Sequence, residues 1–154
     1  MNSHPEVQPL ERQAIEAVCA DLCERIGYQV PQGTAYVKVF GVMSAYADII
    51  KHTSFHLGLT NRQLSTIPLP FTIDIREQVN TLTDYDSRAE RTTFLIAQEL
   101  FAERWKPSRD SVLIVAENLS WALMINDSGG ITYWKQKDPH NLYNLSVPDA
   151  PKEE

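Results

Sequence analysis

The segment from Ser87 to Lys135 limits what this chain can fold into more than any other stretch. Apolar residues cover about half of a helical circumference in its first part, which predicts a helix over residues 88–105 that lies across a sheet. Ser87 and Glu90 have the spacing of a capping box at the start of this helix. A loop with two glycines separates the last two of three apolar runs, so these two are expected to form a hairpin. The three runs predict strands over residues 112–116, 121–125 and 131–134.

Further elements are predicted on the N-terminal side of this segment. Residues 9–26 repeat apolar positions every three or four residues, and Gly27 follows as a typical helix end. β-branched and aromatic residues predict a strand over residues 36–42, and apolar residues partly in helical register predict a helix over residues 44–56. Alternation of apolar and polar side chains predicts one more strand over residues 71–75.

Together these elements predict an α+β fold. We expect an antiparallel sheet of about four or five strands with two long helices packed on one face. A chain of 154 residues can bury a sizeable core, so a single globular domain is predicted over residues 9–147. Residues 1–8 are expected to be a loose N-terminus and residues 148–154 a disordered tail.

The balance of charge argues against nucleic acid as the partner. The chain has 14 Lys and Arg residues against 20 Asp and Glu residues, so its formal net charge is -6. Phosphates repel such a protein unless its basic side chains gather on one face, whereas a basic protein partner is attracted.

The chain is expected to act in the cytoplasm. It begins with no signal-peptide pattern and contains no apolar run of about 20 residues, so no membrane association is predicted. Its two cysteines, Cys19 and Cys23, lie one helical turn apart in an apolar stripe. This placement suits buried reduced thiols rather than a disulfide.

No motif commits the chain to a reaction. It has neither a Gly-x-Ser-x-Gly elbow nor a glycine-rich phosphate loop. His52 and His56 have a spacing that zinc sites use, but no third ligand accompanies them. Asp74, Arg76 and Glu77 could serve catalysis, yet alternating charges are more typical of the solvated face of an edge strand. We therefore expect no enzyme activity, no cofactor and no metal.

Residues 54–67 resemble the core of a helix-turn-helix. Gly58 would form the turn, and Leu64 and Ile67 would pack the second helix. Pro68 and the negative net charge favour the other reading, a helix that ends at Gly58 and a loop after it. A DNA-binding regulator is therefore the alternative hypothesis. The side chains that it would offer to bases and phosphates are Asn61, Arg62, Gln63, Ser65 and Thr66.

The last predicted strand supplies a candidate surface for a protein partner. Alternation places Tyr133 and Trp134 on opposite faces, so one of them is expected to point away from the helix-covered side, near Lys135. The predicted partner-binding residues are Asp74, Arg76, Glu77, Tyr133, Trp134 and Lys135.

The order of elements in residues 71–134 resembles that of small bacterial domains found among toxin-immunity proteins. The resemblance implies an immunity-type function and assigns no role to any individual residue. With the acidic charge, it leads us to expect a non-enzymatic protein-binding domain of the immunity or inhibitor kind, which neutralises a basic toxin or effector.

Overall fold

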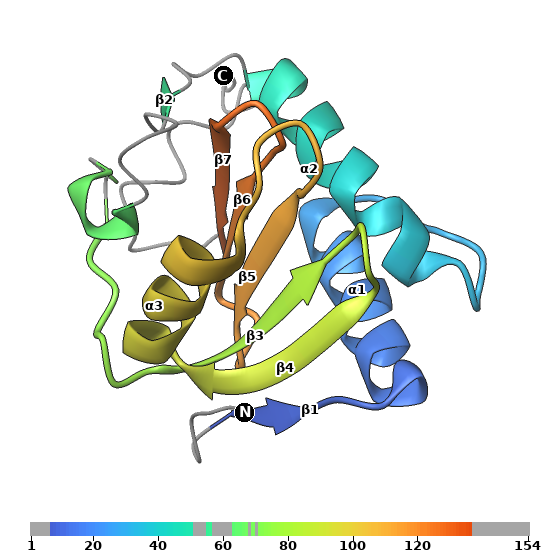
Figure 1. Cartoon of the computed structure of the whole chain (residues 1–154). Helices are drawn as coiled ribbons and strands as arrows, with labels where there is room; N and C mark the ends of the chain where they lie inside the picture. The colour runs from blue at the N-terminus through green and yellow to red at the C-terminus, as the bar shows by residue number, and fades with distance from the viewer. Residues whose placement is uncertain (1–6, 51–54, 57–62, 68, 70, 137–154) are drawn as a thin grey trace.

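One antiparallel sheet runs through the molecule and separates two helical layers (Figure 1). The structure is a computed structural model, and it describes residues 7–50, 55–56, 63–67, 69 and 71–136. The strands are β1 (Gln8–Pro9), β2 (Phe55–His56), β3 (Gln78–Thr83), β4 (Arg88–Thr93), β5 (Val112–Ala116), β6 (Trp121–Ile125) and β7 (Gly130–Lys135). Their order across the sheet is β1-β4-β3-β5-β6-β7-β2, and each neighbouring pair is antiparallel.

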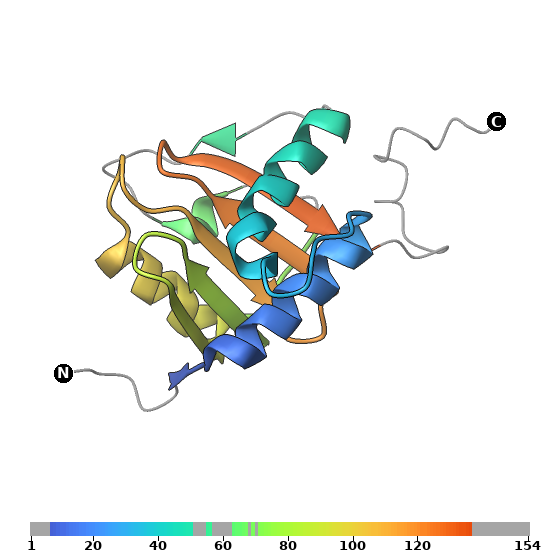
Figure 2. The same cartoon turned by 90° about the vertical axis from the view of Figure 1, so that its right-hand side faces the viewer.

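The helices lie on both faces of this sheet. The two longest, α1 (Arg12–Ile26) and α2 (Ala35–Ile50), pack against each other on one face, and α3 (Phe94–Arg104) covers part of the other face (Figure 2). A short 3-10 helix, η1 (Leu64–Thr66), contacts α3. The chain therefore has three layers, and α3 is part of the connection from β4 to β5.

The central strands are buried on both faces. Each residue of β5 and of β6 is buried. Successive side chains of β5 point to opposite faces, so Leu113 and Val115 join the core under α1 and α2, whereas Ile114 joins the core under α3. The apolar runs that predicted these strands are continuous because neither face of the sheet is open to water here.

The strand predicted over residues 36–42 is wrong, because this segment belongs to the first half of α2. The carboxylate of Glu16 on α1 accepts hydrogen bonds from the N–H groups of Ala35 (2.5 Å) and Tyr36 (3.0 Å). These bonds satisfy two donors that a helix start leaves open. Packing and this cap outweigh the strand preference of the β-branched residues. The buried residues of α2 recur at helical spacing: Ala35, Tyr36, Val39, Val42, Met43 and Tyr46.

The helix predicted over residues 88–105 begins six residues late. Arg88–Thr93 forms β4 and pairs with β3 along its whole length, which satisfies its backbone groups without a helix. Thr93 is the N-cap of α3, and its hydroxyl accepts from the N–H of Ile96 (3.3 Å). Ser87, the predicted cap, instead lies in the β3–β4 turn with a φ of 56°.

The predicted strand over residues 71–75 is also wrong, because these residues form no strand and lead into a turn. In that turn the N–H of Glu77 donates to the carbonyl of Asp74 (3.0 Å). The predicted helix over residues 44–56 is right for residues 44–50 and wrong for residues 55 and 56, which form β2; residues 51–54 lie outside the described part of the chain. The loose N-terminus does not include Gln8, which pairs with β4.

The α+β class is confirmed; the described residues form seven strands in place of four or five, and two of these strands have only two residues. Two long helices do share one face, although the second is α2 rather than the helix predicted over residues 88–105. The predicted helix end at Gly27, the strand β5 and the β6–β7 hairpin are confirmed. Residues 1–6 and the predicted tail over residues 148–154 lie outside the described part of the chain.

Candidate functional site

Helix α3 separates two hollows in the surface. Its side that faces the sheet borders a cavity of about 240 Å³, and its opposite flank borders a groove of about 440 Å³. The residues of α3 at the cavity are Ala97, Leu100, Phe101, Glu103 and Arg104. Those at the groove are Leu95, Gln98, Glu99 and Ala102. Each set recurs at helical spacing, so one helix presents different chemistry on its two flanks.

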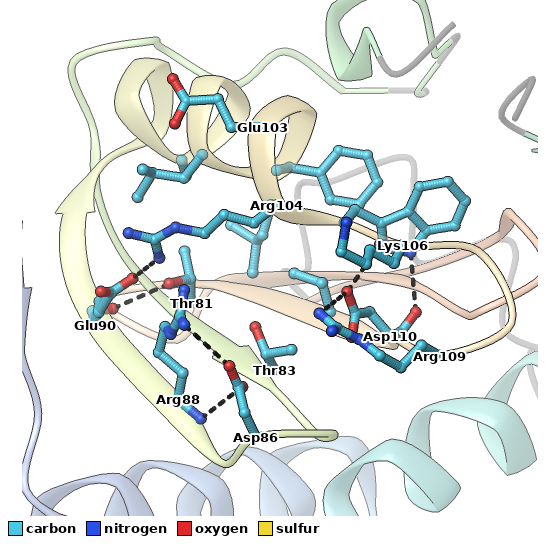
Figure 3. Close-up of a pocket in the computed structure, with 16 residues that line it drawn as sticks. Thr81, Thr83, Asp86, Arg88, Glu90, Glu103, Arg104, Lys106, Arg109 and Asp110 are labelled. Carbon is cyan, nitrogen blue, oxygen red and sulfur yellow. Dashed lines mark hydrogen bonds and ion pairs between the residues drawn. The ribbon is translucent and has the colours of Figure 1, made fainter. Parts of the chain in front are cut away.

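The cavity has an apolar and hydroxylated interior (Figure 3). Thr81 and Thr83 of β3 contribute hydroxyl groups to its lining. Buried Leu100 and Phe101 cover it from α3, and buried Ile114 faces them from the sheet. A small ligand here would contact apolar surface and a few polar groups, which is the usual composition of a ligand pocket.

Charged side chains surround this interior. The Arg104 guanidinium of α3 forms an ion pair of 2.8 Å with Glu90 of β4, whose side chain is only 12% exposed. Arg88 of β4 forms a second pair of 3.1 Å with Asp86 of the β3–β4 turn. Figure 3 shows both pairs on the β4 side of the cavity. The charged lining residues are Asp86, Arg88, Glu90, Glu103, Arg104, Lys106, Arg109 and Asp110.

Asp110 holds the loop that follows α3. Its buried carboxylate accepts from Arg109 Nε (2.6 Å) and Nη2 (2.9 Å) and from the backbone N–H of Lys106 (2.8 Å). Burial alone would raise the pKa of Asp110, but the hydrogen bonds from Arg109 and Lys106 outweigh it and hold the pKa below its usual value. Trp105 Nε1 also donates to the Asp110 carbonyl (2.9 Å), so several hydrogen bonds hold together the loop that forms this wall of the cavity.

The groove carries two exposed apolar side chains. Ile75 is 49% exposed and Leu95 is 42% exposed, although large apolar residues are usually buried. The N–H of Leu95 donates to the carbonyl of Ile75 (2.9 Å), so the two residues are fixed side by side. The rest of the lining is mostly polar, with Gln63 and Ser65 on the η1 side and Gln98 and Glu99 on α3, together with buried Leu64 and the small side chain of Ala102.

The first turn of α3 has no free donors for an anion. The N–H of Phe94 donates to the carbonyl of Glu77 (2.9 Å), that of Leu95 to Ile75, and that of Ile96 to the hydroxyl of Thr93. The same bonds attach residues 75–77 to the helix. They explain why this segment forms a turn against α3 rather than the predicted strand.

The structure places two of the predicted partner-binding residues next to Ile75, outside the groove lining, and uses a third elsewhere. Asp74 and Arg76 are exposed, lie on either side of Ile75 and form an ion pair of 3.4 Å. Hydrogen bonds from the backbone and side chain of Arg76 lower the pKa of Asp74. Glu77 instead accepts from Trp121 Nε1 (3.1 Å) and fixes this segment to the sheet.

The predicted residues of β7 form a separate group. Tyr133 and Trp134 lie on opposite faces, as predicted, and Trp134 is buried in the core under α1 and α2. Tyr133 packs edge-on against Phe71 with ring centroids 5.9 Å apart, and the Lys135 ammonium lies 5.4 Å from the centre of the Phe71 ring. These three side chains therefore contribute to packing.

The predicted second helix of the helix-turn-helix is wrong in its described residues. Gln63 and Ile67 have extended backbone, and only the three residues of η1 between them are helical. Ser65 and Thr66 are exposed, but a 3-10 helix of this length cannot present a recognition face to a major groove. Asn61 and Arg62 lie outside the described residues.

Sequence reasoning missed both hollows. Glu90 and Arg104 lie 14 residues apart in elements that were predicted as one helix, so their pairing was hidden. Leu95 was not singled out in the sequence as an exposed apolar residue. Within the part of the chain that the structure describes, no group of three or more His, Cys, Asp or Glu residues could hold a metal ion. No described helix is long and apolar enough to cross a membrane.

Comparison of the chain with protein-family models, with curated proteins and with solved structures found no match.

Proposed function

We propose that this protein is a non-enzymatic protein-binding domain that receives a basic partner in the groove between η1 and α3. One observation carries the proposal: Ile75 and Leu95 are fixed side by side with about half of each side chain in water. Apolar side chains that gather at a hollow are typical of interaction sites, whereas scattered ones are not.

The charge around these two residues favours a basic partner. Among the described residues that line the groove, Glu99 is the only charged one, so the groove carries a negative charge. Asp74 and Arg76, on either side of Ile75 in the sequence, form an ion pair with each other and add no net charge. Together with the net charge of -6, the charge of Glu99 would speed association with a positively charged protein.

An immunity or inhibitor role follows from the same features. A protein that masks a basic toxin or effector needs an anchoring apolar contact and a surface of opposite charge, and it needs no catalytic residues. We place this role in the cytoplasm, where Cys19 and Cys23 would stay reduced; both are buried, and neither forms a disulfide.

The test is affinity capture with two matched variants, Leu95→Arg and Val37→Arg. Each places the same charge on an exposed apolar position of a helix, but Val37, 71% exposed on α2, lies on the opposite side of the sheet. We expect wild type and Val37→Arg to capture the same basic protein, and Leu95→Arg to bind it at least about tenfold more weakly. Raising the salt concentration from about 50 to 300 mM should slow its association.

A second matched pair tests the charge. Glu99→Lys should weaken binding of the captured protein, whereas Glu24→Lys should not, since Glu24 is an exposed glutamate on α1. Equal capture by all variants, or a partner whose association does not respond to salt, would contradict the proposal. A shift of duplex DNA by the wild-type protein would instead favour the alternative regulator.

A further inference from the structure

We propose that the cavity between α3 and the sheet binds a free α-amino acid with an apolar side chain. This inference is independent of the protein-binding groove, which lies on the other flank of α3. It rests on the spare hydrogen-bonding capacity of one ion pair, on the balance of charge in the lining, and on the size and apolar surface of the cavity.

The Arg104–Glu90 pair is only partly used. A guanidinium has five N–H donors, and within the described part of the chain Arg104 uses one of them, in its bond from Nη1 to Glu90 Oε1. A carboxylate can accept several hydrogen bonds, and among the described residues Glu90 accepts only this one with its side chain. The pair therefore offers the cavity both donors for a carboxylate and an acceptor for an ammonium group.

Burial makes this pair selective. The Glu90 side chain is 12% exposed and that of Arg104 is 39% exposed, so water competes weakly for the glutamate. Charge-assisted hydrogen bonds are stronger in such surroundings than in water. A ligand ammonium next to Glu90 and a ligand carboxylate next to Arg104 would extend the existing pair into a ring of alternating charge.

The rest of the lining selects against ligands with a single charge. It holds four cationic and four anionic side chains, so a simple anion would meet as many repelling as attracting groups. Asp110 does not compete for the ammonium, because Arg109 and the backbone of Lys106 already occupy its oxygens. A zwitterion matches this pattern, and the hydroxyl groups of Thr81 and Thr83 lie within the same cavity.

Size and apolar surface define the side chain of the ligand. A volume of about 240 Å³ corresponds to roughly eight water molecules, which suits a molecule about as large as leucine or phenylalanine. Leu100, Phe101 and Ile114 provide apolar contacts for such a side chain. Glycine, which has no side chain, should therefore bind more weakly than leucine.

The first test uses the wild-type protein and three related compounds. Isothermal titration with L-leucine should show saturable binding. N-acetyl-L-leucine, which lacks the ammonium, and L-leucinamide, which lacks the carboxylate, should each bind at least about tenfold more weakly. The proposal is overturned if neither L-leucine nor L-phenylalanine binds, or if either singly charged analogue binds as well as L-leucine.

The second test locates the ligand. Glu90→Gln preserves the size of the side chain and removes the charge that would hold the ammonium, so it should weaken leucine binding at least about tenfold. Asp74→Asn, which alters an exposed ion pair outside the cavity, should leave binding unchanged. Far-UV circular dichroism of the unliganded variants checks that both are folded. Equal leucine affinity in wild type and a folded Glu90→Gln would place the ligand elsewhere and refute this site.

Discussion

The helical state of residues 35–50 depends on a contact from another helix, which makes Glu16→Ala the most informative substitution. In the folded protein the Glu16 carboxylate accepts from the N–H groups of Ala35 and Tyr36. Alanine leaves both groups without this acceptor at the start of α2. The negative charge next to the positive end of the helix is lost at the same time.

The expected loss can be estimated from the two bonds. A hydrogen bond to a charged group contributes about 1.5–3 kcal/mol, and the lower end applies because Glu16 is only half-buried. Glu16→Ala should therefore reduce the free energy of unfolding by about 3 kcal/mol. For a chain of this size, that corresponds to a decrease in Tm of about 6–12 °C. Glu16→Gln keeps one acceptor oxygen and should cost about half as much.

Urea unfolding, followed by tryptophan fluorescence and by far-UV circular dichroism, measures this loss. Glu24→Ala is the matched control, because Glu24 is an exposed glutamate on the same helix, and it should change stability by less than about 0.5 kcal/mol. If Glu16→Ala loses less than about 1 kcal/mol relative to this control, then α2 does not need the cap and the argument is refuted.

Three further outcomes are expected. Asp110→Asn should lower the free energy of unfolding by about 1–3 kcal/mol in chemical denaturation. Because the lowered pKa of Asp110 stabilises the fold only while the carboxylate is ionised, this variant should lose less stability than wild type as the pH falls. An acid profile equal to that of wild type would contradict this. Burial raises the pKa of Cys19, and it raises the pKa of Cys23 to about 11, so the stability of the fold should fall as the pH rises above 9.0, the ordinary thiol value. The thiols of the folded protein should also react slowly with a disulfide reagent, and rapid labelling of the folded protein would disprove this prediction. Gly130→Ala should cost about 1–3 kcal/mol, because the new Cβ would lie 2.8 Å from Asn126 Nδ2; a melting temperature equal to wild type would show that the turn adapts.

Elements with one dominant local signal were predictable. The apolar run at residues 112–116 could hardly be anything but a central strand, and Gly27 ends α1 with a φ of 116° that few other residues adopt. The turn between β6 and β7 was predictable for the same reason. Its residue Asn126 accepts locally from Ser128 and Gly130 through Oδ1.

The errors arose where two local signals disagreed. Residues 36–42 are rich in β-branched residues, but their apolar positions also recur every three or four residues. As part of α2 they bury this helical stripe against α1 and the sheet, so the second signal decides the structure. Residues 88–93 have an apparent capping box and a helical pattern, but they form a strand that pairs with β3. The pairing with β3 was not visible in that pattern.

The candidate sites could be anticipated only in part. Asp74 and Arg76 were identified as exposed charges, and they are exposed on either side of Ile75 in the sequence. The exposure of Ile75 and Leu95 was not predictable, because it depends on how the chain before β3 reaches α3. The charged pair at the cavity likewise exists only because the fold places Glu90 of β4 and Arg104 of α3 opposite each other.

Short-range periodicity and turn residues were thus enough to establish the α+β class, the first helix and the three strands of the last third of the chain. In each of these elements the local apolar pattern already specifies which side chains are removed from water. The identity of the second helix, the start of α3 and both hollows depend on groups that are far apart along the chain, such as the carboxylate of Glu16 at the start of α2. Backbone groups and charges accept whichever partner the packed fold supplies, and no local pattern contains that information.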